Sequence, residues 1–346
     1  MTSVAKLLFP EAKLRLDSRA LNETLTFAFA TGATGEALDR IMNAATTAAS
    51  LWSEDCFGPD LFLDDFVKRC FATSIDGEVR KFHRGHLKQT LAHGLSDLRV
   101  VRHRQRILAE LAVRPDLHRH CERTWLAIDE LKRLLTSAEL SKRMDPVHRQ
   151  MDILRAVKVS FDQIAASFDT SESGLYTLND FGEEVQGSDG YKHLRDLLDY
   201  EAHLATVDVR LRLGFDGELR GFEIVRATEN RDNPFYSSPL ARFWSKLRML
   251  FRGYRARERE VLGRLLYAVF DGIQRYIVSL FQIQLDLEVL LAAQSFREKS
   301  RQKGLDVCLP TFGATAGLNT RALFNPFLLD EDPAPVPCDL DAEPGA

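Results

Sequence analysis

Apolar residues recur every three or four positions along most of the chain, which is the spacing of amphipathic helices. Prolines are few and stand between these periodic runs. The pattern predicts several short helices up to about residue 120, and longer ones over residues 98–113, 125–135, 151–168 and 191–205. The sequence therefore predicts a mainly α fold with a multi-helical core.

The strongest periodic signal lies near the C-terminal end of the chain. Steps of alternately four and three residues reach only apolar side chains over four heptads: Leu262, Leu266, Val269, Ile273, Tyr276, Leu280, Ile283, Leu287 and Leu290. No proline occurs between Pro239 and Pro310, and Gly304 is a plausible terminator. We predict one helix over residues 258–303, about 65 Å long. At that length we expect it to form a rod that one compact domain does not wrap.

A single segment changes to the period of a β-strand. Residues 206–215 read TVDVRLRLGF, in which every second residue is apolar. Asp216 and Gly217 follow as a two-residue hairpin signal, and ELRGFEIVRA supplies a returning strand. The sequence thus predicts a small β-hairpin, residues 206–227, inserted among long helices.

A basic run follows the hairpin. Residues 242–264 read RFWSKLRMLFRGYRAREREVLGR, with eight Lys and Arg against two Glu. Aromatic residues interleave with the arginines, and this pattern favours contact between the run and the phosphate backbone of a nucleic acid. Arginine can bind phosphate oxygens without reading bases. A solvated helix face is the alternative interpretation.

Composition narrows the class of protein. The chain has 346 residues, 45% of them hydrophobic, and a formal net charge of −4, so any basic site is local. Its five cysteines are an odd number without metal-ligand spacing, which favours a reducing compartment. The N-terminal sequence lacks the apolar core of a secretory signal, and we find no run of about 20 apolar residues. We therefore expect a cytoplasmic protein without a membrane span.

Catalytic patterns are missing from the sequence. The histidines at 83, 86, 118 and 120 have no carboxylate or cysteine at ligand spacing, and surface or capping roles are the better interpretation. The glycine-containing segments 31–39 and 312–320 lack the Lys-Ser/Thr pair of a phosphate-binding loop, and there is no GxSxG motif. We expect neither an enzyme nor a metal or cofactor site in this chain.

Several segments together resemble the MutS family of DNA mismatch-repair proteins, in particular its shorter members. One similar segment is residues 95–117, LSDLRVVRHRQRILAELAVRPDL. It resembles a segment of that family's helical core that contains an Arg-Gln pair. The hairpin, the NPFY segment 233–236 and the long helix follow in the family's order. LFNPFLL, residues 323–329, and VPCDL, residues 336–340, are similar to the segments that lead into the family's ATPase domain.

The resemblance implies a mechanical role. It divides the chain into a helical leader (1–84), a core with an ascending lever (85–205), a clamp-like insertion (206–257), a descending lever (258–304) and a linker toward an ATPase domain (305–346). By position, the DNA-facing candidates are Arg220, Arg226, Arg231, Lys246, Arg248, Arg252 and Arg255. The family's Phe-x-Glu mismatch reader and its phosphate-binding loop have no counterpart here, so neither mismatch recognition nor ATP and Mg²⁺ binding carries over to this chain.

Two functions remain in contention. The first is a MutS-like lever and clamp module that binds the DNA backbone and works with a MutS-type ATPase domain or subunit, with a homodimer as one form of the assembly. The second is a helical scaffold or oligomerisation protein that pairs through residues 262–290 without binding DNA. A cryptic hydrolase has no motif to support it.

Overall fold

A computed structural model describes most of the chain. The described residues are 5–11, 16–43, 54–95, 97–136, 146–202, 206–213, 219–228, 255–313 and 317–343. For residues 54–56, 200–202, 206–213, 219–228 and 255–262 the description extends to the backbone alone.

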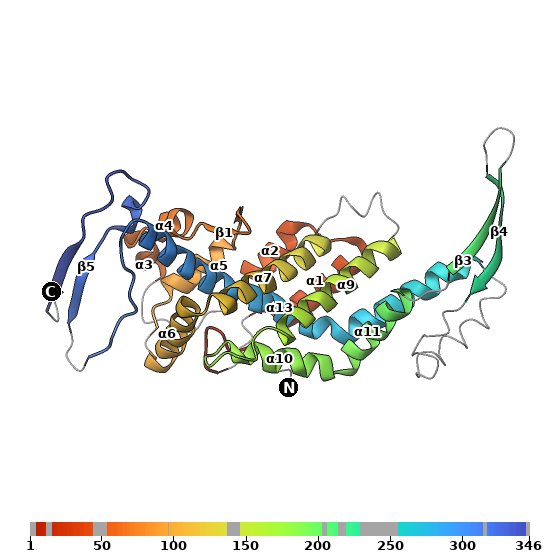
Figure 1. The fold of residues 1–346 in the computed structure, drawn as a ribbon, viewed down its shortest axis with the longest axis horizontal. Helices are drawn as coiled ribbons and strands as arrows, with labels where there is room; N and C mark the ends of the chain where they lie inside the picture. Colours follow the sequence, from red (N-terminus) through yellow and green to blue (C-terminus); the bar gives the residue numbers. More distant parts are fainter. Residues whose placement is uncertain are drawn as a thin grey trace.

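The fold is mainly α, as predicted, with small two-stranded sheets (Figure 1). The helices are α1 (Ser18–Thr31), α2 (Gly35–Asn43), α3 (Glu54–Asp60), α4 (Leu63–Cys70), α5 (Arg84–Ala92), α6 (Leu98–Val113), α7 (Pro115–Thr136), α9 (Pro146–Ala165), α10 (Tyr176–Gly187), α11 (Asp189–Ala202) and α13 (Arg255–Gln302). The strands are β1 (Thr73–Ile75), β2 (Glu78–Arg80), β3 (Thr206–Leu213), β4 (Leu219–Thr228), β5 (Leu318–Leu323) and β6 (Cys338–Ala342), and the short 3-10 helix η2 spans Pro326–Leu328.

Local sequence explains where several helices begin. The Asp17 carboxylate accepts hydrogen bonds from the backbone N–H groups of Arg19 and Ala20 at the start of α1. Asp97 accepts from the Arg99 N–H at 2.8 Å and so caps α6, the helix that contains the Arg-Gln pair. His83 Nδ1 accepts from the His86 N–H at 3.1 Å and caps α5, which confirms a capping role for that histidine. Each side chain satisfies a backbone N–H that has no partner within its helix.

The long C-terminal helix lies at the centre of the molecule and not outside it. Helix α13 has 48 residues, close to the predicted bounds, and every residue from 276 to 288 is buried. It packs against α1, α5, α6, α7, α9 and α11 (Figure 1). The prediction of a rod too long to be wrapped was therefore wrong, because helices from the first 202 residues surround its middle. It is also long and apolar enough to cross a membrane, but 89% of its most apolar window is buried by the protein, as in a core helix.

One hydrophobic core joins the N-terminal part of the chain to α13. The core cluster includes Leu21 and Phe29 from α1, Trp125 from α7, Phe161 from α9 and Phe281 from α13. The rings of Phe29 and Phe270 stack with centroids 4.1 Å apart, and Tyr276 contacts Phe161 edge-on. The described residues of the predicted leader thus share the core with both predicted levers.

The two-stranded sheets differ in how well the sequence predicted them. The strands β3 and β4 are antiparallel and confirm the hairpin, while its Asp216-Gly217 turn lies outside the described residues. The β1–β2 hairpin was missed, although Asp76 and Gly77 supply the same turn signal, with φ of 53° and 78°. Residues 305–346 were predicted as a linker, but the described part of this segment contains η2, β5 and β6.

Candidate functional site

The predicted lever residues lie together along α13. Leu266, Val269, Ile273, Tyr276, Leu280, Ile283, Leu287 and Leu290 are all buried, and the side chain of Leu262 lies outside the described part. Because the neighbouring helices of the same chain cover these side chains, the seam is an internal surface. The scaffold hypothesis expected this seam to bind another protein, whereas its described residues are covered by helices of the same chain.

The candidate DNA-binding residues that the structure describes lie near one end of α13. Arg220 and Arg226 stand on β4, where Arg226 is opposite Asp208 of β3, and Arg255 is the first residue of α13. Arg231, Lys246, Arg248 and Arg252 lie outside the described residues. Figure 1 shows β3 and β4 projecting at this end, beside the start of α13 and the end of α11. The structure therefore brings the described candidates to one end of the molecule.

The opposite end of α13 holds the C-terminal segment. Phe327 lies edge-on to Phe62 and Phe66, and Arg69 of α4 donates a hydrogen bond to its carbonyl oxygen at 2.8 Å. Lys299 of α13 forms an ion pair with Asp330 at 2.7 Å. The C-terminal segment is thus fixed to the end of the long helix that lies farthest from β3 and β4 (Figure 1).

Helices α11 and α13 meet through two glycines. A Cβ atom on Gly190 would lie 2.4 Å from the carbonyl oxygen of Gly272, so the backbones are in direct contact there. A Cβ atom on Gly272 would lie 3.5 Å from the Gly190 Cα, which is an ordinary contact distance. The close approach of the two helices therefore requires glycine at position 190 but not at position 272.

This asymmetry gives a prediction for the helix crossing. We expect Gly190→Ala to lower the free energy of unfolding by about 1–3 kcal/mol, because α11 must shift away from α13. We expect Gly272→Ala to be neutral or stabilising by up to about 1 kcal/mol, because alanine favours the helix and fits. Urea denaturation followed by circular dichroism measures both, and equal effects of the two substitutions would contradict the contact.

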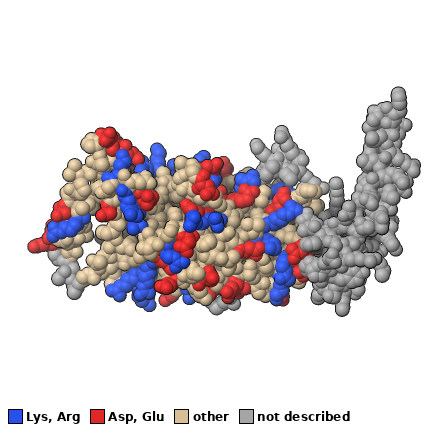
Figure 2. All heavy atoms as spheres, viewed as in Figure 1, with Lys and Arg blue, Asp and Glu red and all other residues tan. Residues whose placement is uncertain are grey.

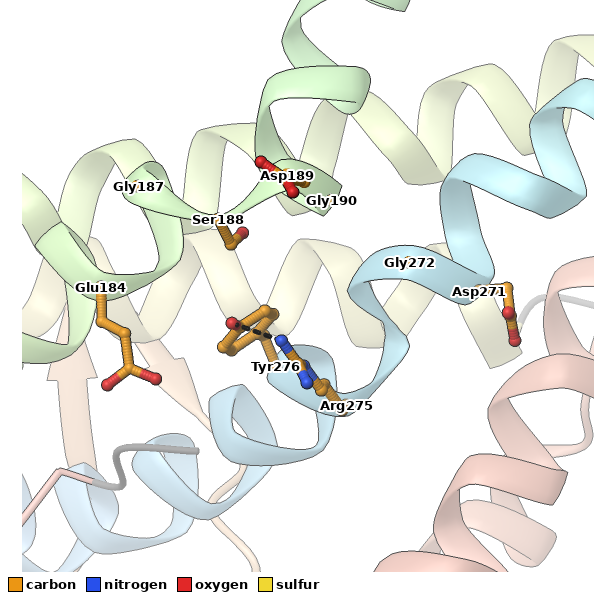
Figure 3. A pocket seen from close by; sticks show the side chains of 9 residues that line it. All are labelled: Glu184, Gly187, Ser188, Asp189, Gly190, Asp271, Gly272, Arg275 and Tyr276. Atoms are coloured by element: carbon orange, nitrogen blue, oxygen red, sulfur yellow. Dashed lines mark hydrogen bonds between the residues drawn. The ribbon is translucent and has the colours of Figure 1, made fainter. Parts of the chain in front are cut away.

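A hollow of about 600 Å³ opens beside this crossing (Figure 3). Its wall includes carboxylates from three elements, Glu184, Asp189 and Asp271, together with Arg275, which donates a hydrogen bond to the Tyr276 hydroxyl at 2.8 Å. In the part of the chain with described side chains, no group of three or more His, Cys, Asp or Glu residues could hold a metal ion. The hollow marks the joint between α10, α11 and α13.

A single carboxylate holds both sides of the α10–α11 joint. Asp162 of α9 accepts hydrogen bonds from Gln186 at the end of α10, at 3.2 Å, and from the hydroxyl of Tyr191 in α11. Its other oxygen contacts Lys158 at 2.6 Å. Burial, followed by the bond to Asp162, raises the pKa of Tyr191, so the phenol remains a donor. The base of α11 is thus tied to α9 as well as to α13.

Sequence reasoning missed a buried polar group on α13. In residues 281–289, FQIQLDLEV, polar and apolar residues alternate, which places polar side chains on two sides of a helix. Gln282 donates to Asp286 at 2.9 Å on one side. On the other side, Glu288 accepts from the His83 backbone N–H at 2.7 Å and from Trp125 Nε1 at 3.0 Å. The alternation inside a heptad pattern was the signal that the helix is buried all round.

Burial dominates the electrostatics of this group. Glu288 is 4% exposed, and desolvation raises its pKa to about 7 despite the two hydrogen bonds. Desolvation also raises the pKa of Asp129 and lowers the pKa of His83, with Lys132 adding to the effect on the histidine. The group ties α13 to α7 and to the start of α5 and can take up a proton near neutral pH.

Charge on the exposed surface is mixed. Figure 2 shows acidic and basic side chains interspersed over the body on the face that it presents. Of the four cysteines with described side chains, Cys70 and Cys121 are buried and Cys308 and Cys338 are exposed, all as free thiols. A search of protein-family models and of curated proteins finds no match to this chain.

Proposed function

We propose that this chain is the lever and clamp module of a MutS-like DNA-repair protein, in which the β3–β4 end contacts the DNA backbone. The observation that carries the proposal is α13, one uninterrupted helix of 48 residues. It is about 70 Å long, starts beside β3–β4 and ends at the C-terminal segment. A movement at one end of such a helix reaches the other end, because a packed helix moves as a unit.

The order of the elements also supports the proposal. Helix α11 leads to β3 and β4, and α13 returns antiparallel beside α11 to the opposite end of the molecule (Figure 1). This order agrees with the ascending lever, clamp and descending lever that the resemblance of residues 85–340 implies, and so supports the proposal. In the proposed mechanism, a MutS-type ATPase domain or subunit acts at the C-terminal end of the module. The β3–β4 end holds DNA without reading its sequence. The module works in the reducing environment of the cytoplasm.

DNA binding tests this function. We expect the full chain to bind labelled duplex or branched DNA at low salt and to lose affinity steeply as salt rises, because phosphate contacts release counterions. Reversing Arg248, Arg252 and Arg255 to Glu should weaken binding by at least about tenfold. Fluorescence anisotropy titrations at several salt concentrations measure both effects.

A matched control uses arginines at another place. Arg102 and Arg106 are exposed on α6, away from the β3–β4 end. Reversing these two to Glu should leave DNA affinity within about twofold at moderate salt. The DNA-clamp proposal would be lost if the wild-type chain failed to bind any duplex, branched or single-stranded DNA at low salt, or if both sets of substitutions weakened binding equally.

A further inference from the structure

The sheet of β5 and β6 has one apolar face. Cross-strand partners share a face of a sheet, and the partners here are Leu318 with Ala342, Thr320 with Leu340, and Leu323 with Cys338. A register shift between Thr320 and Leu323 adds one residue to β5 and returns Leu323 to the same face as Leu318. Asp339 and Asp341 alternate with these residues and therefore belong to the opposite face.

This apolar face is exposed. Leu318, Leu323 and Leu340 are 55%, 44% and 42% exposed. Among the described elements, β5 and β6 pair only with each other, and a two-stranded sheet alone is marginally stable. Alternation of apolar and charged residues along β6 is typical of a strand with one buried face. The sheet thus has the composition of a strand pair with one buried face, but no described strand covers that face.

The two edges of the sheet differ. On β5 the register shift and the positive φ of Ala322, 53°, distort the strand, and a bulge of this kind impedes pairing at an edge. On β6 the residues 338–342 are regular, so the backbone N–H and C=O groups of its outer edge can pair with another strand. Any added strand is therefore expected beside β6.

The acidic charge of residues 305–343 indicates which side chains an added strand should have. Residues 305–343 contain one basic residue, Arg321, and seven acidic residues: Asp306, Asp330, Glu331, Asp332, Asp339, Asp341 and Glu343. Figure 2 shows acidic side chains at this end of the molecule. Asp339 already accepts from Arg321 and from the Ala322 N–H, at 3.0 and 2.9 Å, while Asp341 is exposed. A neighbouring strand gains from basic residues beside Asp341 and apolar residues beside Leu340.

We propose that β6 accepts an extended strand of another protein in which apolar and basic residues alternate. The strand extends the sheet, its apolar side chains enlarge the face of Leu318, Leu323 and Leu340, and its Lys or Arg residues lie beside Asp341. A second copy of β6 fits poorly at this edge, because its aspartates would face the same aspartates. The site lies at the far end of α13 from β3–β4 and is independent of DNA binding.

A peptide titration tests the proposal. The probe is a labelled peptide of alternating valine and lysine that is long enough to span β6, added to the full chain and followed by fluorescence anisotropy. We expect saturable binding, at least about tenfold tighter than that of the matched valine–glutamate peptide. A valine–lysine peptide with a central proline should bind about tenfold more weakly, because proline removes a ladder donor.

Variants locate the binding site. Leu340→Ser and Asp341→Lys should each weaken binding at least about tenfold, one through the apolar face and the other through charge. Leu309→Ser and Asp306→Lys change exposed residues of the same acidic segment outside the sheet and should change affinity less than about twofold. Unchanged thermal unfolding of the helical body shows that each variant is folded.

Several outcomes would overturn the proposal. They are no saturable binding of the valine–lysine peptide, equal binding of the glutamate or proline peptide, and binding indifferent to Leu340→Ser. In these cases the aspartates only protect an exposed edge from aggregation. Sedimentation velocity measures a further outcome that would overturn the proposal. If the wild type is a dimer and Leu340→Ser converts it to a monomer, a second copy of the chain covers the face.

Discussion

Replacing Arg149 by methionine is expected to lower the free energy of unfolding by roughly 2–4 kcal/mol. Arg149 on α9 is 3% exposed. Its guanidinium donates to four backbone carbonyls at the ends of two other helices: Ala28 and Phe29 of α1 at 2.6 and 3.1 Å, and Leu134 and Leu135 of α7 at 3.2 and 3.3 Å. The Gly32 and Ala33 N–H groups also donate to Ala28 and Leu135, and Gln150 donates to Phe29. Methionine would therefore remove four hydrogen bonds from a charged donor, and the Leu134 carbonyl, near the end of α7, would lose its guanidinium partner in a partly buried place.

The effect of Arg149 comes from its shape as well as its charge. A positive charge favours the negative ends of the two helix dipoles, and the planar fork reaches both helix ends together. Lysine keeps the charge and loses the fork, so Arg149→Lys should retain only part of the stability. The control is Arg155→Met, at an exposed position of the same helix beside Asp152, which should change stability by less than about 1 kcal/mol. Urea denaturation followed by circular dichroism compares the three variants, and a loss of under about 1 kcal/mol for Arg149→Met would contradict this role.

The second large effect is a dependence of stability on pH that arises from Glu288. The pKa of this carboxyl is about 7 in the folded chain against 4.5 ordinarily, so between these values the folded state binds more protons than the unfolded state. Raising pH through this window therefore lowers the free energy of unfolding, by about 3 kcal/mol in total. Below about pH 4.5 both states are protonated and the penalty disappears.

The variant Glu288→Gln isolates this contribution. Glutamine cannot ionise, but it has only one acceptor oxygen for the two donors, the His83 N–H and Trp125 Nε1. Its amide N–H group would face the other donor, so one hydrogen bond is lost. We expect the variant to be less stable than the wild type at low pH, and the difference to shrink or reverse as pH rises to about 7.5. Denaturation across the pH range measures the difference. Glu298→Gln, on an exposed position of α13, is the control for the change of residue type, and a flat difference for Glu288→Gln would contradict the proton uptake.

The sequence predicted the elements better than their arrangement. Periodicity located α13, α6 and the β3–β4 hairpin to within a few residues, because each depends on local spacing and turn chemistry. It did not show that α13 is wrapped, since a heptad seam looks the same whether the covering helix belongs to the same chain or another. The alternating polar residues from Gln282 to Glu288 held that information, because a rod exposed on one side has no reason to place hydrogen-bonded polar pairs on opposite sides.

The features of the candidate site also fall into those that local sequence predicts and those that it does not. The position of Arg220, Arg226 and Arg255 near one end of α13 follows from chain order and was predicted. The contact of Gly190 with Gly272 and the bonds from Asp162 to α10 and α11 depend on pairs far apart in sequence, and no local pattern indicates them. The apolar face of β5 and β6 was missed for another reason: the register shift that aligns Leu323 with Leu318 appears only once the strands are paired.

The late position of α13 in the chain has a consequence for biosynthesis. Helices α1, α7 and α9 surround a segment that the ribosome makes only after them, between residues 255 and 302. Until then, the side chains that contact α13, among them Phe29, Trp125 and Phe161, lack the partners that α13 supplies. The nascent chain therefore cannot complete its core during most of its synthesis, and this long interval is when it depends most on protection from aggregation.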